Sequence, residues 1–502
     1  MNRGDETQSA IAALDSGCGS EVHTRLRRTG IVAGRNSLFT VLAQAGGKVA
    51  SLLLFLALVR RLTVAEIGQF SFALTFVGIF GLLSDWGIST WMMREVARHR
   101  GDASRWFSAA LCAKSLTFIV SATAGLIIAW VTKVSPGAWS VIPILFLAMA
   151  PDVLAQTMGY LFLAFERGGA SALVTGLTDW LRLGCVYLAL RAVPDLPHVA
   201  WAYLLATSVP PLLFSFLLAR HGVKLTRPSL DNLKTAVRGG IPFLLVGVFI
   251  RVYLRADTLL LAYLKTDFSV GTYNAAYKLT EALMFIPAAF MGAIFPLLSR
   301  NFGRDMDQFR AGCRTAIRVL STMGLPLAVG TTLIAPQVIA RLYGPQYGSS
   351  VLYLRILIWA TALIFVNATL PASLNASGKE KCTLAVVAAG ILLNVAGNLV
   401  LIPLLDALGA AIMTVVTEAF STLLYFYFFR RFLFGPGIPG LIWRPLLASV
   451  LMGFAVFRVL SLPLLVVIGV GVLSYGLCLT AIGGIRRREL ELAMAVFGVK
   501  RP

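Results

Sequence analysis

Ionisable side chains inside long apolar runs are the residues of this sequence that point most directly to chemistry. Arg251 and Arg255 are four positions apart, which places both on one face of a helix, and Lys278 lies in the next apolar run. Lys48 lies in the first run. Clustered cations at membrane depth suit an anion such as pyrophosphate, because the arginine fork matches phosphate oxygens. We therefore predict a pyrophosphate-binding cluster made by Arg251, Arg255, Lys278 and Lys48.

Carboxylates near these cations leave a second interpretation open. Asp257 and Glu281 are close enough in sequence to neutralise Arg255 and Lys278 as local charge partners. For the arginines, local pairing and a free cationic cluster are therefore equally consistent with the sequence.

Two further carboxylates lie alone in apolar runs. Asp85 and Asp152 would carry protons or Na⁺ in an ion-coupled transporter, whereas Asp85 near the end of its run would also be explained by hydration or by pairing with Arg94. Lys48 has either Asp85 or a ligand as its expected partner. Asp179 and Arg182 are three positions apart, which favours a local ion pair.

Histidines and cysteines give no sign of a metal or a cofactor. The 4 histidines have no metal-ligand or catalytic-triad spacing, and the 6 cysteines include no CxxC pair. We expect neither a metal nor a cofactor, and no enzymatic activity.

The elements that carry these residues are predicted to be membrane-spanning helices. Of the 502 residues, 58% are hydrophobic and 13% charged, and the mean hydropathy is +0.80, which excludes a water-soluble domain. The net charge of +21 comes mostly from breaks between apolar runs, so nucleic-acid binding is not indicated. The sequence predicts an all-α polytopic membrane protein of about fourteen transmembrane helices. The predicted spans are 36–59, 68–92, 107–132, 138–165, 171–192, 198–219, 240–264, 270–298, 315–340, 350–373, 382–404, 408–429, 441–460 and 463–484.

Lysines and arginines predict the orientation of these spans. One alternate set of loops and tails holds about 30 of them and the other set about 7, so both termini should be cytoplasmic. Residues 1–35 and 485–502 are expected to be cytoplasmic tails, the first disordered and without a cleaved signal peptide.

A repeated motif divides the chain into two related halves. Gly68-Gln69-Phe70 through Ala73 and Gly271-Thr272-Tyr273 through Ala276 share the pattern G-x-[FY]-x-x-A between the first two helices of each half. We predict two six-helix lobes in parallel repeat, with a cavity between them and alternating access. The lobes are 36–219 and 240–430, joined by a cytoplasmic linker at 220–239; two peripheral helices follow at 441–484.

The order and spacing of several motifs resemble the oligosaccharide flippases of polysaccharide export, within the multidrug/oligosaccharidyl-lipid/polysaccharide exporter superfamily. These motifs include Asp85-Trp86-Gly87-Ile88, Arg255-Ala256-Asp257-Thr258, Val270–Leu279, Phe295-Pro296-Leu297 and Leu342-Tyr343-Gly344-Pro345. The resemblance implies an inner-membrane transporter that flips lipid-linked repeat units for O-antigen, capsule or exopolysaccharide, and Lys278 is placed like a cation of the related lipid II flippases. Its expected partners are a lipid-linked oligosaccharide, membrane lipids, and a polysaccharide polymerase and chain-length regulator.

Three alternatives remain beside this expectation. A drug/cation antiporter would favour an acidic cavity, which the excess of arginine and lysine opposes. A membrane glycosyltransferase or ligase would have a long outer loop with catalytic residues, whereas every predicted outer loop is short. A lipid II flippase would share fold and mechanism, so the sequence does not separate it from a flippase for another sugar.

Overall fold

The computed structural model describes residues 43, 45–220, 223–433 and 439–483, and every regular element within these ranges is helical. Thirteen helical segments are long and apolar enough to cross a membrane, and a shorter apolar helix, Ala45–Val59, precedes them. The predicted all-α polytopic fold is therefore confirmed. The start of the predicted first span, at 36–42, lies outside the described residues.

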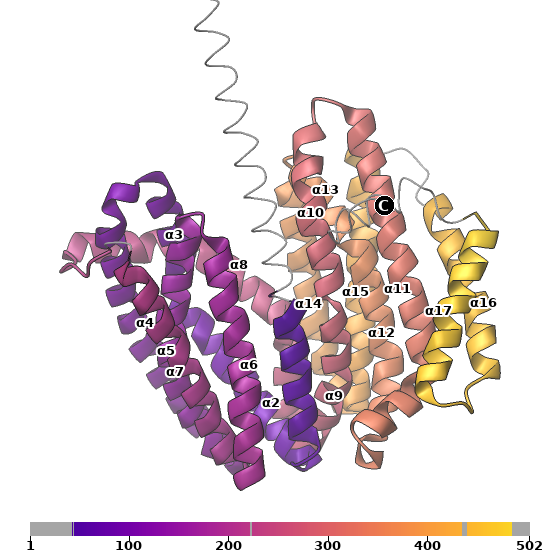
Figure 1. Ribbon diagram of the computed structural model, residues 1–502, viewed down its shortest axis with the longest axis horizontal. Helices are drawn as coiled ribbons and strands as arrows, with labels where there is room; N and C mark the ends of the chain where they lie inside the picture. The colour runs from indigo at the N-terminus through magenta and orange to yellow at the C-terminus, as the bar shows by residue number, and fades with distance from the viewer. Residues whose placement is uncertain (1–42, 44, 221–222, 434–438, 484–502) are drawn as a thin grey trace, which may run out of the picture.

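The first half of the chain forms one group of helices, on the left in Figure 1. Most observed bounds differ from the predicted spans by only a few residues, because apolar runs must be about 20 residues long to cross the hydrocarbon core. The bounds are α2 Val64–Asp85, α3 Ile88–Arg98, the 3₁₀ helix η1 Arg100–Asp102, α4 Ala103–Val131, α5 Pro136–Ala164, α6 Gly168–Ala192 and α7 Leu196–Ala219.

The second half, apart from α8, forms the group on the right in Figure 1. Its bounds are α8 Leu230–Leu264, α9 Asp267–Leu283, α10 Phe285–Asn301, α11 Met306–Leu342, the 3₁₀ helix η2 Pro345–Tyr347, α12 Ser350–Asn367, α13 Thr369–Ala376, α14 Glu380–Leu405, α15 Ala407–Phe432, α16 Pro439–Arg458 and α17 Leu464–Ala481. α8 begins inside the segment expected to link the lobes, where the Ser229 hydroxyl caps the helix by accepting from the Asn232 amide. The division into lobes at 36–219 and 240–430 stays a prediction.

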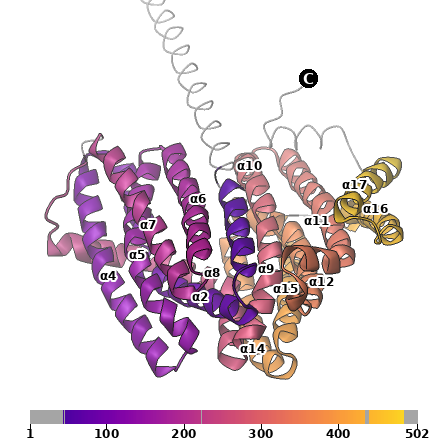
Figure 2. The ribbon, with the colours of Figure 1, turned by 60° about the horizontal axis from the view of Figure 1, so that its bottom comes forward.

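Three helices, α8, α16 and α17, have distinctive positions relative to these groups. α8 packs against α2, α3 and α4 of the first group and against α14 of the second, so it connects the two physically as well as in sequence. The last helices, α16 and α17, pack on α11 and lie at the outer edge in both Figure 1 and Figure 2. Their peripheral position agrees with their lack of charged residues away from the helix ends.

The Asp85-Trp86-Gly87-Ile88 motif interrupts the second membrane span. Trp86 and Gly87 have positive φ angles of 50° and 70°, which end α2 and restart the chain as α3. A Cβ added to Gly87 would lie 2.3 Å from the carbonyl oxygen of Gly240 in α8. Glycine is required here both for its backbone conformation and for the close approach of α8.

The two copies of the repeated motif pack directly against each other. A Cβ added to Gly68 in α2 would lie 1.8 Å from the carbonyl oxygen of Asp267, and one added to Gly271 in α9 would lie 2.1 Å from that of Val64. The Gln69 side chain adds a hydrogen bond of 2.9 Å from Nε2 to Asp267 Oδ2. This reciprocal contact has the form of a twofold interface. We call the end of the bundle that carries it, at Val64–Gln69 and Asp267–Gly271, the closed end.

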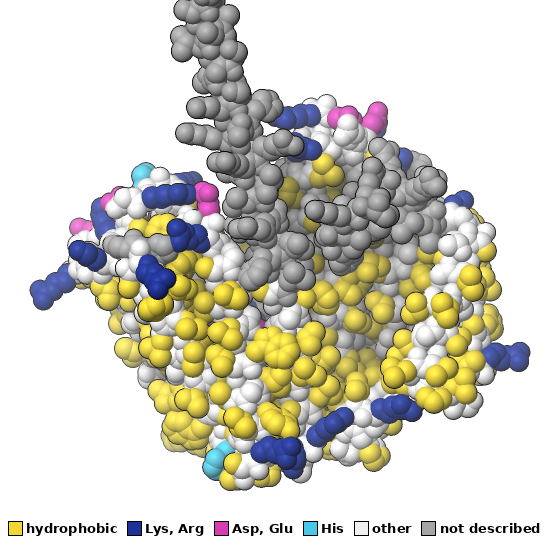
Figure 3. Space-filling model, viewed as in Figure 1, with side chains coloured by type: hydrophobic (Ala, Val, Ile, Leu, Met, Phe, Trp, Pro, Cys, Tyr) yellow, Lys and Arg dark blue, Asp and Glu magenta, His cyan; other side chains and the backbone are white. Residues whose placement is uncertain are grey.

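The surface is typical of a membrane protein. Figure 3 shows hydrophobic side chains across the middle of one face, with lysine and arginine gathered toward both ends. Many large apolar side chains point outward, among them Leu212, Leu392 and Leu465, which are 70%, 72% and 81% exposed. An exposed apolar belt of this kind is stable only against lipid.

Candidate functional site

Three of the four predicted cations, Lys48, Arg251 and Arg255, line a cavity between the two groups of helices. The cavity has a volume of about 660 Å³ and is lined by the helix Ala45–Val59, the end of α5, α6, α8, α9 and the start of α10. A smaller cavity of about 160 Å³ adjoins it, shares Arg251, Arg255, Tyr277 and Glu281 with it, and is the one that Lys278 lines. The larger cavity reaches Gly168, at the end of the bundle opposite the closed end.

Glu281 is the point on which three of the four predicted cations converge. Its Oε1 lies 3.0 Å from Arg255 Nη2 and 3.8 Å from Lys48 Nζ, and its Oε2 lies 3.3 Å from Lys278 Nζ. The side chains come from the first described helix, α8 and α9, so the cluster depends on the packing of three helices. Local pairing and a cationic cluster, which the sequence left as alternatives, are therefore both present.

Arg251 completes the cluster without an ion pair among the described residues. It lies one helical turn before Arg255 in α8, lines both cavities and is exposed. Arg255 is oriented by the ring of Tyr277, whose centroid lies 5.3 Å from the guanidinium carbon. Four cations against two carboxylates, Glu281 and Asp179, leave an excess of positive charge around these two adjoining cavities, which suits a phosphate-bearing ligand. That these residues bind pyrophosphate stays a prediction.

Asp257 lies apart from this cluster, contrary to the expected pairing with Arg255. Its side chain is buried, accepts a short hydrogen bond from the Tyr273 hydroxyl, and accepts a second, of 2.7 Å, from the Thr258 amide. Arg255 instead pairs with Glu281. Residues two apart on a helix point in different directions, which separates Arg255 from Asp257.

Asp85 forms an ion pair with Lys114, a partner that the sequence did not predict. Oδ1 of Asp85 lies 2.7 Å from Nζ of Lys114, a residue that is 0% exposed. The same oxygen accepts a hydrogen bond of 2.5 Å from the Ser89 hydroxyl. Arg94, one expected partner, lies 3.4 Å from Glu95. The pair spans the break between α2 and α3 and joins it to α4, so its position indicates a structural role.

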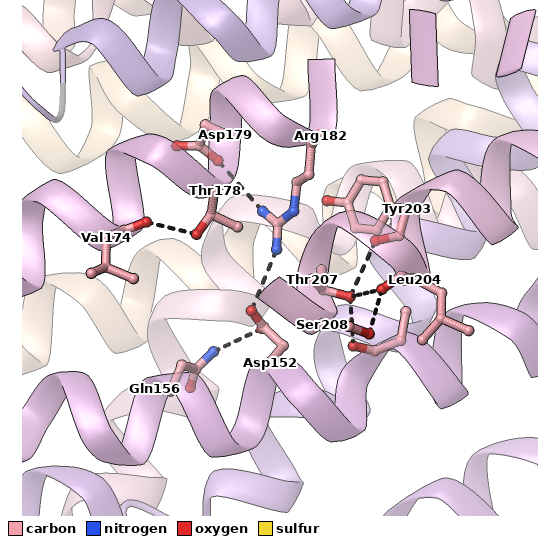
Figure 4. A network of polar contacts seen from close by, with 11 residues as sticks. Asp152, Gln156, Val174, Thr178, Asp179, Arg182, Tyr203, Leu204, Thr207 and Ser208 are labelled. Atoms are coloured by element: carbon pink, nitrogen blue, oxygen red, sulfur yellow. Dashed lines mark hydrogen bonds and ion pairs between the residues drawn. The ribbon is translucent and has the colours of Figure 1, made fainter. Parts of the chain in front are cut away.

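Asp152 and Asp179 meet at Arg182, as Figure 4 shows. Arg182 lies 3.4 Å from Asp179 Oδ1, so the local pair favoured by the sequence is present, and 3.4 Å from Asp152 Oδ1. Asp152 also accepts a 3.1 Å hydrogen bond from Gln156. These residues line a third cavity, of about 360 Å³, between α5, α6 and α7.

A buried network in the second half was missed by sequence reasoning. Glu418 of α15 accepts a 2.6 Å hydrogen bond from the Tyr253 hydroxyl and one of 3.2 Å from the Asn367 amide. A lone glutamate at membrane depth is a sequence signal for such a network. The partners of Glu418, however, come from α8 and α12, which are far away in sequence.

Within 43, 45–220, 223–433 and 439–483, no three histidine, cysteine or carboxylate side chains are grouped to hold a metal ion. The five cysteines in those ranges are free.

Comparison with known proteins gives the relatives of this chain. A family model described as "Polysaccharide biosynthesis protein" matches residues 33–302, and one described as MatE matches residues 242–400. The chain is 28% identical over 178 residues to "Probable flippase AglR" of Haloferax volcanii, covering 34% of this chain and 37% of that protein. The chain spans less than half the length of several curated relatives that it matches.

Two further similarities extend over most of the chain. It is 22% identical over 412 residues to "Putative O-antigen transporter" of Escherichia coli K12, covering 79% of this chain and 96% of that protein. In fold it is similar to a lipid II flippase, MurJ, in an inward closed conformation, with a TM-score of 0.74, 12% identity, and coverage of 90% and 99% of the two chains. The similarity to MurJ, at 12% identity, shows the fold alone.

Proposed function

Because the chain belongs to the polysaccharide biosynthesis protein family, we propose that it flips an oligosaccharide repeat unit linked to undecaprenyl pyrophosphate across the inner membrane. It is a multi-pass membrane transporter of the flippase type and not an enzyme. The repeat unit would supply O-antigen, capsule or exopolysaccharide biosynthesis on the outer side. A polysaccharide polymerase and a chain-length regulator are the partners that would then take it over.

The observation that supports this proposal is the positive charge around the cavity of about 660 Å³. A pyrophosphate diester brings two negative charges into a low-dielectric region, and desolvation makes this costly unless fixed cations replace the lost water. Arg251, Arg255, Lys278 and Lys48 supply more positive charge than the two carboxylates of these adjoining cavities, Glu281 and Asp179, neutralise. A drug or cation antiporter would instead require a cavity that attracts cations.

Alternating access is the proposed mechanism. The reciprocal contact of Gly68 and Gly271 shuts one end, while the cavity extends toward the other end. The lobes would rock so that this contact opens when the opposite end closes. The lysine and arginine distribution supports cytoplasmic termini, which makes the closed end the outer end. The charge cluster would then accept its substrate from the cytoplasmic leaflet.

Deletion of the protein tests the proposal. We expect an unpolymerised pyrophosphate-linked repeat unit to accumulate in the cytoplasmic leaflet, measured by lipid extraction and by its accessibility to a membrane-impermeant enzyme. Accumulation of a peptidoglycan precursor instead would favour a lipid II flippase. Drug sensitivity with normal polysaccharide would favour an antiporter.

Substitutions test the cationic cluster itself. Arg255→Ala and Lys278→Ala should abolish export without preventing membrane insertion, because each removes one cation that faces the cavity. Arg458→Ala, at the end of peripheral α16, is the matched control and should export normally. Normal export by well-expressed Arg255→Ala and Lys278→Ala variants would refute the cluster as the binding site.

A further inference from the structure

The third cavity, between α5, α6 and α7, adjoins the cationic cavity but has a different chemical character. Both cavities are lined by Leu163, Ser171, Thr175 and Asp179, so α6 forms a wall common to the two. The volume of about 360 Å³ is within the range of small-ligand sites. A ligand whose phosphates lie at Arg255 would therefore have space beside it on the α6 side.

Hydrogen-bonding side chains face this cavity in two rows. Asp152, Gln156 and Tyr160 follow one another at four-residue spacing on α5, which places them on one helix face. Ser171, Thr175 and Asp179 do the same on α6 and line the same cavity. The α10 side of the larger cavity is apolar by contrast, and is formed by Phe285, Ala288 and Ala289.

The hydrogen-bonding capacity of these rows is only partly used. Arg182 reaches Asp152 and Asp179 at 3.4 Å each, longer than the 2.7–2.9 Å or so of a charge-assisted bond. The Nε of Arg182 is buried without a partner among the described residues. Each carboxylate has about four acceptor positions. Arg182 and Gln156 occupy two of those of Asp152, and Arg182 occupies one of those of Asp179, so others remain for a ligand that donates hydrogen bonds.

The two cavities have opposite net charge, which indicates different ligand groups for each. Two carboxylates around one guanidinium leave the α5–α6 cavity with net negative charge, whereas the neighbouring cluster is positive. A pyrophosphate is repelled by the first and attracted by the second. Neutral hydroxyl and amide groups, which donate to carboxylates and accept from arginine, fit the first.

We infer that the α5–α6 cavity, with Asp152, Gln156, Thr175, Asp179 and Arg182, binds the sugar next to the pyrophosphate, and selects a neutral sugar over a uronic acid. The inference rests on the proposed function, because the pyrophosphate at Arg255 positions the sugar beside α6. A uronate would bring its charge against Asp152 and Asp179, where like charges repel.

Binding of purified full-length protein to three defined lipids tests the inference. The probes are undecaprenyl pyrophosphate, the same lipid carrying N-acetylglucosamine, and the same lipid carrying glucuronic acid. We expect the N-acetylglucosamine lipid to bind at least about tenfold more tightly than the sugar-free lipid, since one or two hydrogen bonds supply that factor. The glucuronic acid lipid should bind no more tightly than the sugar-free lipid.

Two variants remove hydrogen-bonding groups while keeping side-chain volume. Gln156→Leu should reduce the preference for N-acetylglucosamine about fivefold to tenfold, with binding of undecaprenyl pyrophosphate unchanged within twofold. Thr175→Val, in the wall common to the two cavities, should reduce the same preference by a similar factor. Thr332→Val is the matched control, because the hydroxyls of Thr175 and Thr332 both bond the carbonyl four residues earlier in their helix. It should bind all three lipids as the natural protein does.

The outcomes separate the two proposals. An unchanged sugar preference in both Gln156→Leu and Thr175→Val, or an equal loss for all lipids, would overturn the sugar subsite, as would tighter binding of the glucuronic acid lipid. If Arg255→Ala binds undecaprenyl pyrophosphate as well as the natural protein, the proposed pyrophosphate site fails instead. Failure of the natural protein to bind any of the lipids would refute both.

Discussion

Replacing Gly68 or Gly271 with alanine should open the closed end of the molecule. The added Cβ would lie 1.8 Å from the Asp267 carbonyl oxygen or 2.1 Å from that of Val64, whereas Cβ atoms essentially never come within 3.0 Å of such atoms. The obstructing atoms are backbone, so no side chain can move aside. The α2 and α9 backbones must therefore separate by roughly 1 Å, since van der Waals repulsion rises steeply below contact distance.

The energy of this separation follows from the contacts that it breaks. The 2.9 Å bond from Gln69 to Asp267 would be lost, and a hydrogen bond to a charged group contributes about 1.5–3 kcal/mol. With the lost packing of the two helices, the closed end should be destabilised by about 2–4 kcal/mol, which changes the ratio of closed to open forms by about 30-fold to 1,000-fold. The fraction of molecules that are closed at this end should fall accordingly.

Double electron–electron resonance, which gives the distance between two spin labels, measures this change. Labels at Arg61 and Phe268, both exposed near the closed end, should show a longer distance in Gly68→Ala and Gly271→Ala than in the natural protein, in a cysteine-free background. Gly78→Ala, also in α2, is the matched control, because nothing lies within 4 Å of its added Cβ while it gains the same helix propensity. Equal distance distributions in all four proteins would refute the reasoning.

Two further predictions concern buried charges. Lys114→Met should lower the free energy of unfolding by about 3–5 kcal/mol, because it leaves Asp85 without its 2.7 Å partner; thermal unfolding in detergent measures this, and recovery is expected when Asp85→Asn is added. An unchanged midpoint would contradict the structural role of the pair. Glu281→Gln should tighten binding of undecaprenyl pyrophosphate about tenfold and slow export, because it removes a negative charge from the cationic cavity. Weaker binding would mean that orienting Arg255 and Lys278 is the main role of Glu281.

Helix positions were predicted closely from the sequence, because the bilayer imposes them. Apolar runs of the required length predicted thirteen spans that the structure describes, and the Thr63 capping box marks the start of α2 as the local sequence requires. The breaks inside spans were not predicted. The chain bends at Trp86–Gly87 because two consecutive residues have positive φ angles, and sequence periodicity carries no signal for this.

The sequence predicted the residues of the candidate site but not which of them pair with one another. The charged residues were recognisable because ionisable groups at membrane depth are rare and costly. Their partners were misassigned for Asp85 and Asp257, because neighbours in sequence were considered before neighbours in space. Lys114 and Tyr273 are the actual partners.

Membrane insertion, the positions of thirteen spans and the presence of buried charge were thus determined by the sequence alone, since the cost of placing polar groups in lipid acts on each segment separately. Which charges meet was decided by the tertiary structure, because Lys48, Arg255 and Lys278 converge on Glu281 only when three helices pack together. The repeated glycine motif shows the same division. Its two copies are visible in the sequence, but only the packing of α2 on α9 places Gly68 and Gly271 against each other's backbone.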